Sequence, residues 1–178
     1  MSDVFLKRSF PAALDVADLN RMVEDSLGCF GLHRVDWEES FLSAECTDLF
    51  CHFRAPDAES VRIALRQLQA DMRVHWTGTI HDAPGVSEAE MLGANVLVHR
   101  HFEEPVELAD LQAIEDGNVH CLEAHRVRFM RTFFSSDQRH MACLYAAPDA
   151  ESVRIAQRQA TMPVDSVWAV KRLAPDLL

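Results

Sequence analysis

The chain has 178 residues, of which 48% are hydrophobic and 25% charged, as in an ordinary folded protein. Its formal net charge of −11 argues against a nucleic-acid partner and an anionic membrane surface, because both bind clustered Lys and Arg. No apolar run approaches the ~18 residues of a spanning helix, and the N-terminus lacks the apolar core of a signal peptide. These features predict a cytoplasmic protein. The five cysteines, an odd number without a CxxC pair, argue against disulfides and a structural zinc knot.

One decapeptide, Ala-Pro-Asp-Ala-Glu-Ser-Val-Arg-Ile-Ala, occurs twice, at residues 55–64 and 147–156. Shifting the sequence against itself by the same offset, without a gap, also aligns His33-Arg34-Val35 with His125-Arg126-Val127 and Trp76 with Trp168. The chain is therefore a tandem duplication. We expect a first repeat at residues 1–81, a linker at 82–95 and a second repeat at 96–178. Residues related by this offset are called repeat-equivalent below.

Hydrophobic periodicity and turn residues predict the same order of elements in both repeats. The first repeat has a predicted strand at 4–10, a helix from Asp15 to a stop at Gly28, strands at 32–42 and 46–54, a helix capped by Asp57 and a strand at 73–80. The second has a strand at 96–102, a helix at 108–120, strands at 124–134 and 141–147, a helix from Asp149 and a strand at 166–173. The linker contains a turn and a short helical turn at 87–92.

This β-α-β-β-α-β order is that of the ferredoxin-like fold, which belongs to the α+β class. Such a sheet carries its helices on one face, and here the strands place apolar residues on both faces. A second sheet is the natural cover. The sequence thus predicts two ferredoxin-like repeats packed as an intramolecular dimeric α/β barrel, an internal pseudo-dimer for which further homo-oligomerisation is open.

Three segments resemble a family of small single-domain bacterial proteins of unknown function. They are Leu6-Lys7-Arg8-Ser9-Phe10-Pro11, the run Val35 to Phe41, and Cys51-His52-Phe53-Arg54-Ala55-Pro56 with the helix start that follows. The second repeat matches as well, through Cys143-Leu144-Tyr145-Ala146-Ala147-Pro148-Asp149. The resemblance implies a ferredoxin-like fold, and some members of the family are nickel-binding or nickel-responsive homodimers. It supplies no metal motif that can be transferred residue by residue.

Four histidines are candidate metal ligands. His99 and His101 are two apart in a predicted strand and so share a face, which suits a divalent transition metal such as nickel or zinc. Further ligands would have to come from neighbouring strands or from Glu103, Glu104 and His140. His33 and His125 are repeat-equivalent and precede a strand in each repeat. The alternative is that His99 and His101 are solvent-facing strand residues and that His33 and His125 bond to backbone groups.

Arg8 and Arg100 are candidate ligand-binding residues. An arginine on the same strand face as Val and Phe is costly to bury unless it meets an anion. Either arginine could hold an acidic ligand, or could instead form a structural pair with a carboxylate such as Glu39. Cys51 and Cys143 lie in mid-strand, where a buried thiol stays protonated, so nucleophilic catalysis has little support.

These observations leave three hypotheses for function. The first is a small metal-binding protein, with nickel suggested by the resemblance, or a ligand-binding protein. The second is a dimeric-barrel enzyme, of the cofactor-free oxygenase or isomerase type, that orients a small anionic molecule through Arg8 or Arg100. The third is a structural module without a site. A metal requires a third ligand near His99 and His101, whereas an enzyme requires an enclosed cavity with a polar group in it.

Overall fold

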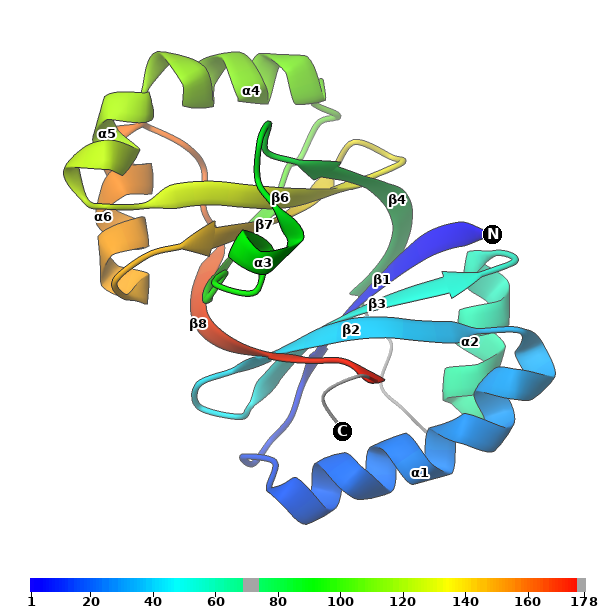
Figure 1. Ribbon diagram of the computed structural model, residues 1–178. Helices are drawn as coiled ribbons and strands as arrows, with labels where there is room; N and C mark the ends of the chain where they lie inside the picture. Colours follow the sequence, from blue (N-terminus) through cyan, green and yellow to red (C-terminus); the bar gives the residue numbers. More distant parts are fainter. Residues whose placement is uncertain (69–73, 176–178) are drawn as a thin grey trace. The chain divides into compact units, whose positions relative to one another are not determined.

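The computed structural model describes residues 1–68 and 74–175, and its elements follow the duplicated sequence (Figure 1). They form two units, Met1–Gly78 with Lys171–Leu178, called unit 1, and Thr79–Val170, called unit 2. The elements that begin in unit 1 are β1 Ser2–Ser9, α1 Val16–His33, β2 Asp36–Ser43, β3 Asp48–Ala55, α2 Ala58–Gln67 and β4 Val74–Asp82. Those that begin in unit 2 are α3 Glu88–Met91, β5 Val96–His101, α4 Leu108–Gly117, α5 Val119–Ala124, β6 Arg128–Ser135, β7 His140–Ala146, α6 Ala150–Gln159 and β8 Ser166–Leu173.

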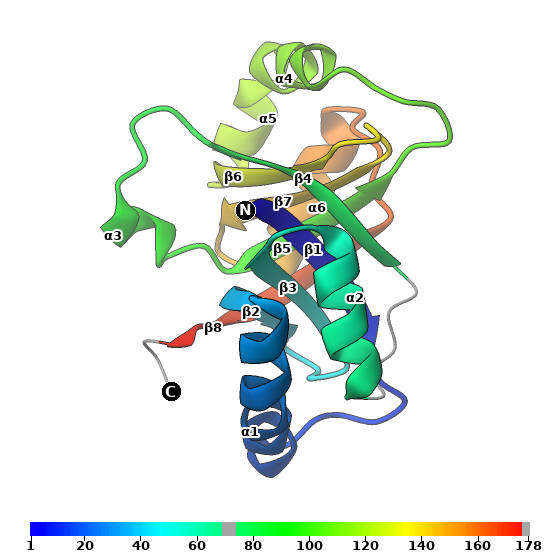
Figure 2. The same cartoon turned by 90° about the vertical axis from the view of Figure 1, so that its right-hand side faces the viewer.

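Unit 1 contains an antiparallel sheet in the order β4-β1-β3-β2. Its register places Leu6 of β1 and Ser40 of β2 on either side of Cys51 of β3. Helices α1 and α2 lie on one face of this sheet, as both views show (Figures 1 and 2). This arrangement is the predicted ferredoxin-like unit.

Unit 2 repeats the arrangement with the order β8-β5-β7-β6, and α4, α5 and α6 cover one face (Figure 1). Here Val98 and Thr132 flank Cys143, the repeat-equivalents of Leu6, Ser40 and Cys51. The predicted fold class is confirmed: the chain is α+β and is built from two ferredoxin-like units. The helix caps predicted at Asp57 and Asp149 are also present, since each side chain accepts the backbone N–H three residues on.

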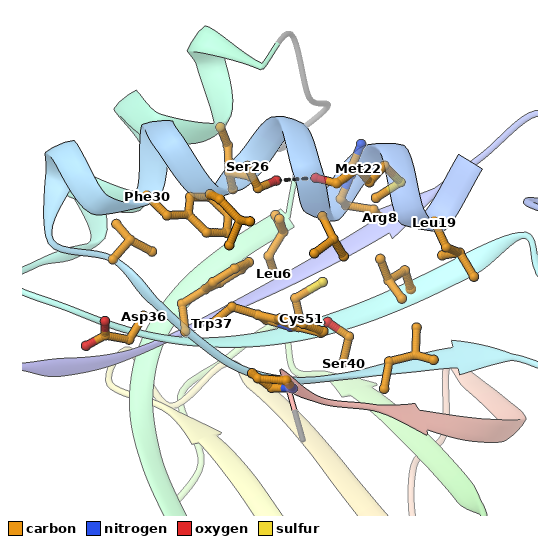
Figure 3. A pocket seen from close by; sticks show the side chains of 18 of the residues that line it. Leu6, Arg8, Leu19, Met22, Ser26, Phe30, Asp36, Trp37, Ser40 and Cys51 are labelled. Carbon is orange, nitrogen blue, oxygen red and sulfur yellow. Dashed lines mark hydrogen bonds between the residues drawn. The ribbon is translucent and has the colours of Figure 1, made fainter. Parts of the chain in front are cut away.

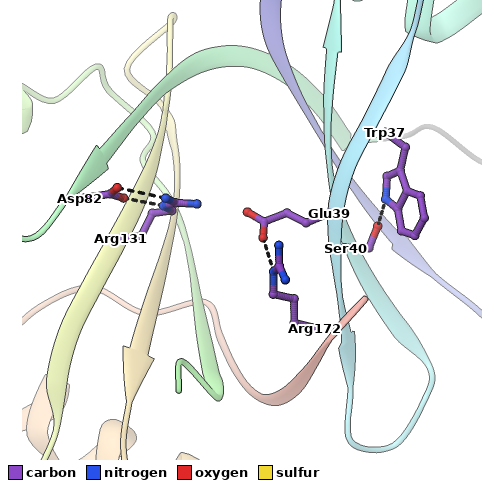
Figure 4. A network of polar contacts seen from close by, with 6 residues as sticks. All are labelled: Trp37, Glu39, Ser40, Asp82, Arg131 and Arg172. Atoms are coloured by element: carbon purple, nitrogen blue, oxygen red, sulfur yellow. Dashed lines mark hydrogen bonds and ion pairs between the residues drawn. The ribbon is translucent and has the colours of Figure 1, made fainter. Parts of the chain in front are cut away.

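The unit boundaries differ from the predicted repeat boundaries because two strands continue past them. β4 begins in unit 1 and ends in unit 2, and β8 begins in unit 2 and ends in unit 1. The end of each strand that crosses the boundary contributes one side chain to an ion pair in the unit that it enters (Figure 4). In unit 1, Arg172 of β8 donates to Glu39 at 2.7 Å, and in unit 2, Arg131 donates to Asp82 of β4 at 2.5 Å.

The first helix differs most from the prediction. Gly28 does not end it, because a glycine inside a helix is tolerated at a modest cost. Instead α1 continues to His33, and Arg34 takes the left-handed conformation (φ 56°) that closes the last turn. The predicted strand at 32–42 was therefore wrong at its start, where residues 32 and 33 are helical. Arg73 of the predicted strand at 73–80 lies outside the described residues.

The equivalent helix in unit 2 was predicted as one segment but is broken in two. Asn118 separates α4, which ends at Gly117, from α5, and the Asn118 side-chain amide donates to the carbonyl of Ile114 at 2.8 Å. In α1 the same positions are Asp25 and Ser26, and the helix continues through them. Among the described residues, no helix is long and apolar enough to cross a membrane.

Candidate ligand-binding pocket

A pocket of about 810 Å³ lies within unit 1, between α1 and the sheet (Figure 3). Leu19, Met22 and Phe30 of the helix point toward Trp37 and Cys51 on the strands. The volume is in the range of small-molecule sites. The lining is mainly apolar and comprises Leu6, Arg8, Val16, Leu19, Asn20, Met22, Val23, Ser26, Leu27, Phe30, Gly31, Val35, Asp36, Trp37, Ser40, Leu49, Cys51, Phe53, Leu65, Lys171, Arg172, Leu173 and Pro175.

The pocket exists because α1 packs only loosely against the sheet. None of its residues is buried, and Val16 and Leu27, which line the pocket, are 73% and 69% exposed. In unit 2 the break between α4 and α5 allows both pieces to pack on the core, where Leu111 and Leu122 are buried. Their repeat-equivalents in α1, Leu19 and Phe30, are only half-buried.

Arg8 lies at one end of the pocket, near Leu19 and Met22 (Figure 3). Its guanidinium stands 4.8 Å from the centre of the Phe10 ring, a cation–π contact. Lys171 also lines the pocket, as does Arg172, which is paired with Glu39. Among the described residues, the charged ones that line the pocket are three cations and one acid, Asp36, in a chain whose net charge is −11.

Arg100, the repeat-equivalent of Arg8, is 1% exposed and lies in a polar network. It donates to Gln157 Oε1 at 2.7 Å and to the Tyr145 hydroxyl at 3.3 Å, and that hydroxyl donates to Glu115 Oε1 at 2.7 Å. Burial opposes the charge of Arg100, but Tyr145, Cys143 and Glu115 outweigh it and raise the pKa of Arg100. Unit 2 therefore holds a carboxylate that is connected to the buried arginine through the Tyr145 hydroxyl.

In unit 1 an apolar side chain stands at each position equivalent to a partner of Arg100. Phe53, Val23 and Leu65 are the repeat-equivalents of Tyr145, Glu115 and Gln157, and all three line the pocket around Arg8. A smaller hollow of about 570 Å³ in unit 2 lies beside α4, α5 and the start of β6, and Arg100 does not line it. The arginine is thus retained in both units, and the network of Tyr145, Glu115 and Gln157 belongs to unit 2.

The pocket floor holds few other polar groups. Trp37 donates its indole N–H to the Ser40 hydroxyl at 2.9 Å. Burial raises the pKa of the Cys51 thiol to about 11, against a smaller opposing effect of Ser40 and Arg8. Cys51 is therefore a neutral thiol at physiological pH, as expected from its place in mid-strand, and supplies no nucleophile.

The four candidate metal ligands are spread over both units. His33 Nε2 lies 3.3 Å from Gln67 Oε1, and the repeat-equivalent His125 Nε2 lies 3.0 Å from Gln159 Oε1. His33 thus connects the end of α1 to α2, and His125 connects the end of α5 to α6. His99 is buried, with its ring 5.5 Å from that of Trp168.

His101 has a different neighbour. Its ring centre lies 4.9 Å from that of His140, the residue directly opposite it on β7. Burial lowers the pKa of His140, with opposing contributions from Asp137 and Asp165, which favours the neutral imidazole that binds metals. Among residues 1–68 and 74–175 no group of three or more His, Cys, Asp or Glu side chains could hold a metal ion.

Comparison with solved structures supports the fold. The protein TA0507, named as a chlorite dismutase, has a TM-score of 0.52 at 10% identity over 96% of this chain and 94% of its own. FN1347 of Fusobacterium nucleatum, named as a monooxygenase, has a TM-score of 0.46 at 10% identity over 98% and 95%. An anthrone oxidase-like protein has a TM-score of 0.46 at 7% identity over 97% and 93%. At 10% identity, the likeness to TA0507 shows the fold alone.

Comparison by sequence identifies the family. No curated protein matches the chain. One family model, described as "Nickel responsive protein SCO4226-like", matches residues 5–73 and again residues 97–170, one match for each repeat. The family suggested by the sequence segments is thereby confirmed, and the chain belongs to the SCO4226-like nickel-responsive protein family.

Proposed function

We propose that unit 1 binds a small apolar molecule in the pocket beneath α1, so that the chain is a ligand-binding protein. The observation that carries this proposal is the pocket itself, about 810 Å³ of mainly apolar surface under a helix without a buried residue. Exposed apolar surface is unfavourable in water, and a ligand that covers it gains roughly 25 cal/mol per Å² removed from water. The binding energy would come from this burial.

The pocket does not favour a hydrolytic or thiol-based enzyme. Cys51 is protonated and so is not a nucleophile. The hydrogen-bonded pair on the pocket floor is Trp37 and Ser40, and neither side chain is a general base. A cofactor-free oxygenase or isomerase needs no linear sequence motif. Such an enzyme would act on the molecule that binds in this pocket. Binding therefore comes before any catalysis and is the property to test.

The test uses N-phenyl-1-naphthylamine, an uncharged dye whose fluorescence rises in apolar surroundings. The wild-type protein should bind one dye molecule per chain. Ser26→Phe adds a ring to the pocket-facing side of α1 and should weaken dye binding at least about tenfold, or 1.4 kcal/mol. Asp25→Phe adds the same ring at an exposed neighbouring position and should leave binding unchanged. Equal binding by all three proteins, or none by the wild type, would contradict the proposal.

A second candidate function is nickel binding at His101 and His140. Two observations favour it, the ring-to-ring distance of 4.9 Å and the nickel-responsive family to which the chain belongs. Imidazole nitrogen suits Ni²⁺, and two such ligands give a modest affinity that competes with protons. The sequence alone suggested the pair His99 and His101 instead.

Calorimetry with Ni²⁺ distinguishes the two pairs. For a site at His101 and His140, both His101→Ala and His140→Ala lose the binding heat, and His99→Ala keeps it. For the pair suggested by the sequence, His99→Ala loses the heat and His140→Ala keeps it. Binding that survives all three substitutions would exclude both, and His120→Ala, at an exposed histidine outside the candidate ligands, serves as the control.

A further inference from the structure

Ser40 of β2 is a buried polar residue on the floor of the pocket. It is 3% exposed and lies beside Trp37 and Cys51 (Figure 3). The Ser40 oxygen accepts the indole N–H of Trp37 at 2.9 Å, because an indole can donate but not accept. This bond uses a lone pair of the hydroxyl and leaves the hydroxyl hydrogen for another acceptor.

Cys51 is the second neighbour of this hydroxyl in the described part of the chain. The two residues are paired directly across β2 and β3, and their side chains are within hydrogen-bonding reach. A thiol sulfur accepts weakly, and the protonated thiol can itself donate to the remaining lone pair of Ser40. The oxygen of a bound carbonyl group would be a stronger acceptor for the Ser40 hydrogen.

The pair of Trp37 and Ser40 distinguishes unit 1 from unit 2. The repeat-equivalents are Phe129 and Thr132, and the Thr132 hydroxyl lies 3.2 Å from the Cys143 sulfur. A phenyl ring has no N–H, so unit 2 lacks the indole donor at this position. Because consecutive hydrogen bonds polarise one another, the indole strengthens the Ser40 hydroxyl as a donor.

The rest of the lining is suited to a flat ring system. Phe30, Trp37 and Phe53 line the pocket, and the rings of Phe30 and Phe53 meet edge to face with their centres 5.4 Å apart. Aromatic rings favour contacts of this kind. On the helix side, the Ser26 hydroxyl already donates to the Met22 carbonyl at 2.5 Å, so its hydrogen is not available to a ligand.

We infer that the ligand of unit 1 is an aromatic ketone, whose rings pack beneath α1 and whose carbonyl oxygen accepts from the Ser40 hydroxyl. This inference rests on the proposed function. A neutral carbonyl suits the site, because a carboxylate is costly to bury with a single hydrogen bond and an alcohol brings a hydrogen that needs its own acceptor. Ser40 then determines specificity, and Trp37 is a positioning residue that acts through Ser40.

The test compares fluorenone with fluorene, two flat ring systems of nearly the same shape that differ in one carbonyl oxygen. Each displaces N-phenyl-1-naphthylamine from the wild-type protein and from Ser40→Ala. The ratio of the two affinities is compared between the two proteins, so that the difference in hydrophobicity between the probes cancels. One neutral hydrogen bond is expected to account for about a fivefold effect, so Ser40→Ala should weaken fluorenone binding about fivefold relative to fluorene binding.

Two further variants use the residues of unit 2. Ser40→Thr keeps a hydroxyl and should keep the wild-type ratio. Trp37→Phe removes the indole N–H and should lower the ratio, by less than Ser40→Ala does. A merely structural role of either residue would change the affinity for both probes alike and leave the ratio unchanged. Far-UV circular dichroism checks that each variant is folded, and Trp37→Phe tests the pair even where Ser40→Ala does not fold.

The outcomes separate the inference from the proposed function. A ratio that is the same in the wild type and in Ser40→Ala would overturn the inference and leave the proposed function standing. A ratio that falls as far in Ser40→Thr as in Ser40→Ala would also overturn it, since the hydroxyl would then not be the source of the preference. Absence of dye binding would overturn the proposed function itself.

Discussion

Tyr145→Phe removes one hydroxyl from the network around Arg100, and its effect on stability follows from the geometry. Tyr145 is fully buried, and its hydroxyl donates to the Glu115 carboxylate at 2.7 Å and accepts from Arg100 at 3.3 Å. A hydrogen bond to a charged group contributes roughly 1.5–3 kcal/mol, and the longer contact adds less. The substitution also leaves a buried carboxylate without its donor. We therefore expect a loss of about 2–3 kcal/mol.

Urea denaturation followed by far-UV circular dichroism measures this loss. With a slope of about 2–3 kcal/mol per molar, the midpoint should fall by roughly 1 M while the slope is unchanged. The melting temperature should fall by roughly 4–12 °C for a chain of this size. Phenylalanine is the residue that unit 1 carries at the equivalent position, Phe53, so the ring itself fits the fold. A loss below about 0.5 kcal/mol would refute a stabilising role of the network.

Three further predictions concern titratable groups. Because burial raises the pKa of Cys51 to about 11 from 9.0, its alkylation by iodoacetamide at pH 8 should be about 100-fold slower than in the urea-unfolded chain, measured by peptide mass spectrometry; equal rates would contradict its burial. Burial likewise raises the pKa of Tyr145, the only tyrosine, so the rise in absorbance at 295 nm should come at a higher pH in the folded protein than in the urea-unfolded chain, and coincident transitions would contradict this. The backbone N–H of Ser87, and after it Arg128, lowers the pKa of Glu90 from 4.5 to about 2. This stabilisation is present above pH 4.5 and lost as the pH falls toward 2, so Glu90→Gln should flatten the dependence of stability on pH in that window.

Local sequence signals were sufficient for much of the fold. Asp57 and Asp149 cap their helices as the duplicated decapeptide predicts, and β8 spans Ser166–Leu173, the predicted range. The start of β2 was misplaced because Gly28 suggests a helix end. The end is instead set by Arg34, in a left-handed conformation that hydrophobic periodicity does not reveal.

The site was predicted only in part. The sequence singled out Arg8 and Arg100 as buried cations that need a partner, but could not distinguish them. The difference depends on side chains far apart in the sequence that the fold brings together, such as Glu115, Tyr145 and Gln157 around Arg100.

A signal for this difference was nevertheless present. When the repeats are aligned, Val23, Phe53 and Leu65 of the first repeat face polar residues of the second. These are Glu115, Tyr145 and Gln157. The proximity of His101 to His140 was not predictable from spacing, because it depends on the register between β5 and β7.

The most direct test of ligand binding in unit 1 is the crystal structure of the protein with N-phenyl-1-naphthylamine. We predict that the aromatic rings of the dye lie between α1 and the sheet, against Phe30 and Trp37, and that the Arg100 network is unchanged. A dye molecule bound elsewhere on the protein, with the pocket beneath α1 left without it, would contradict the proposed function.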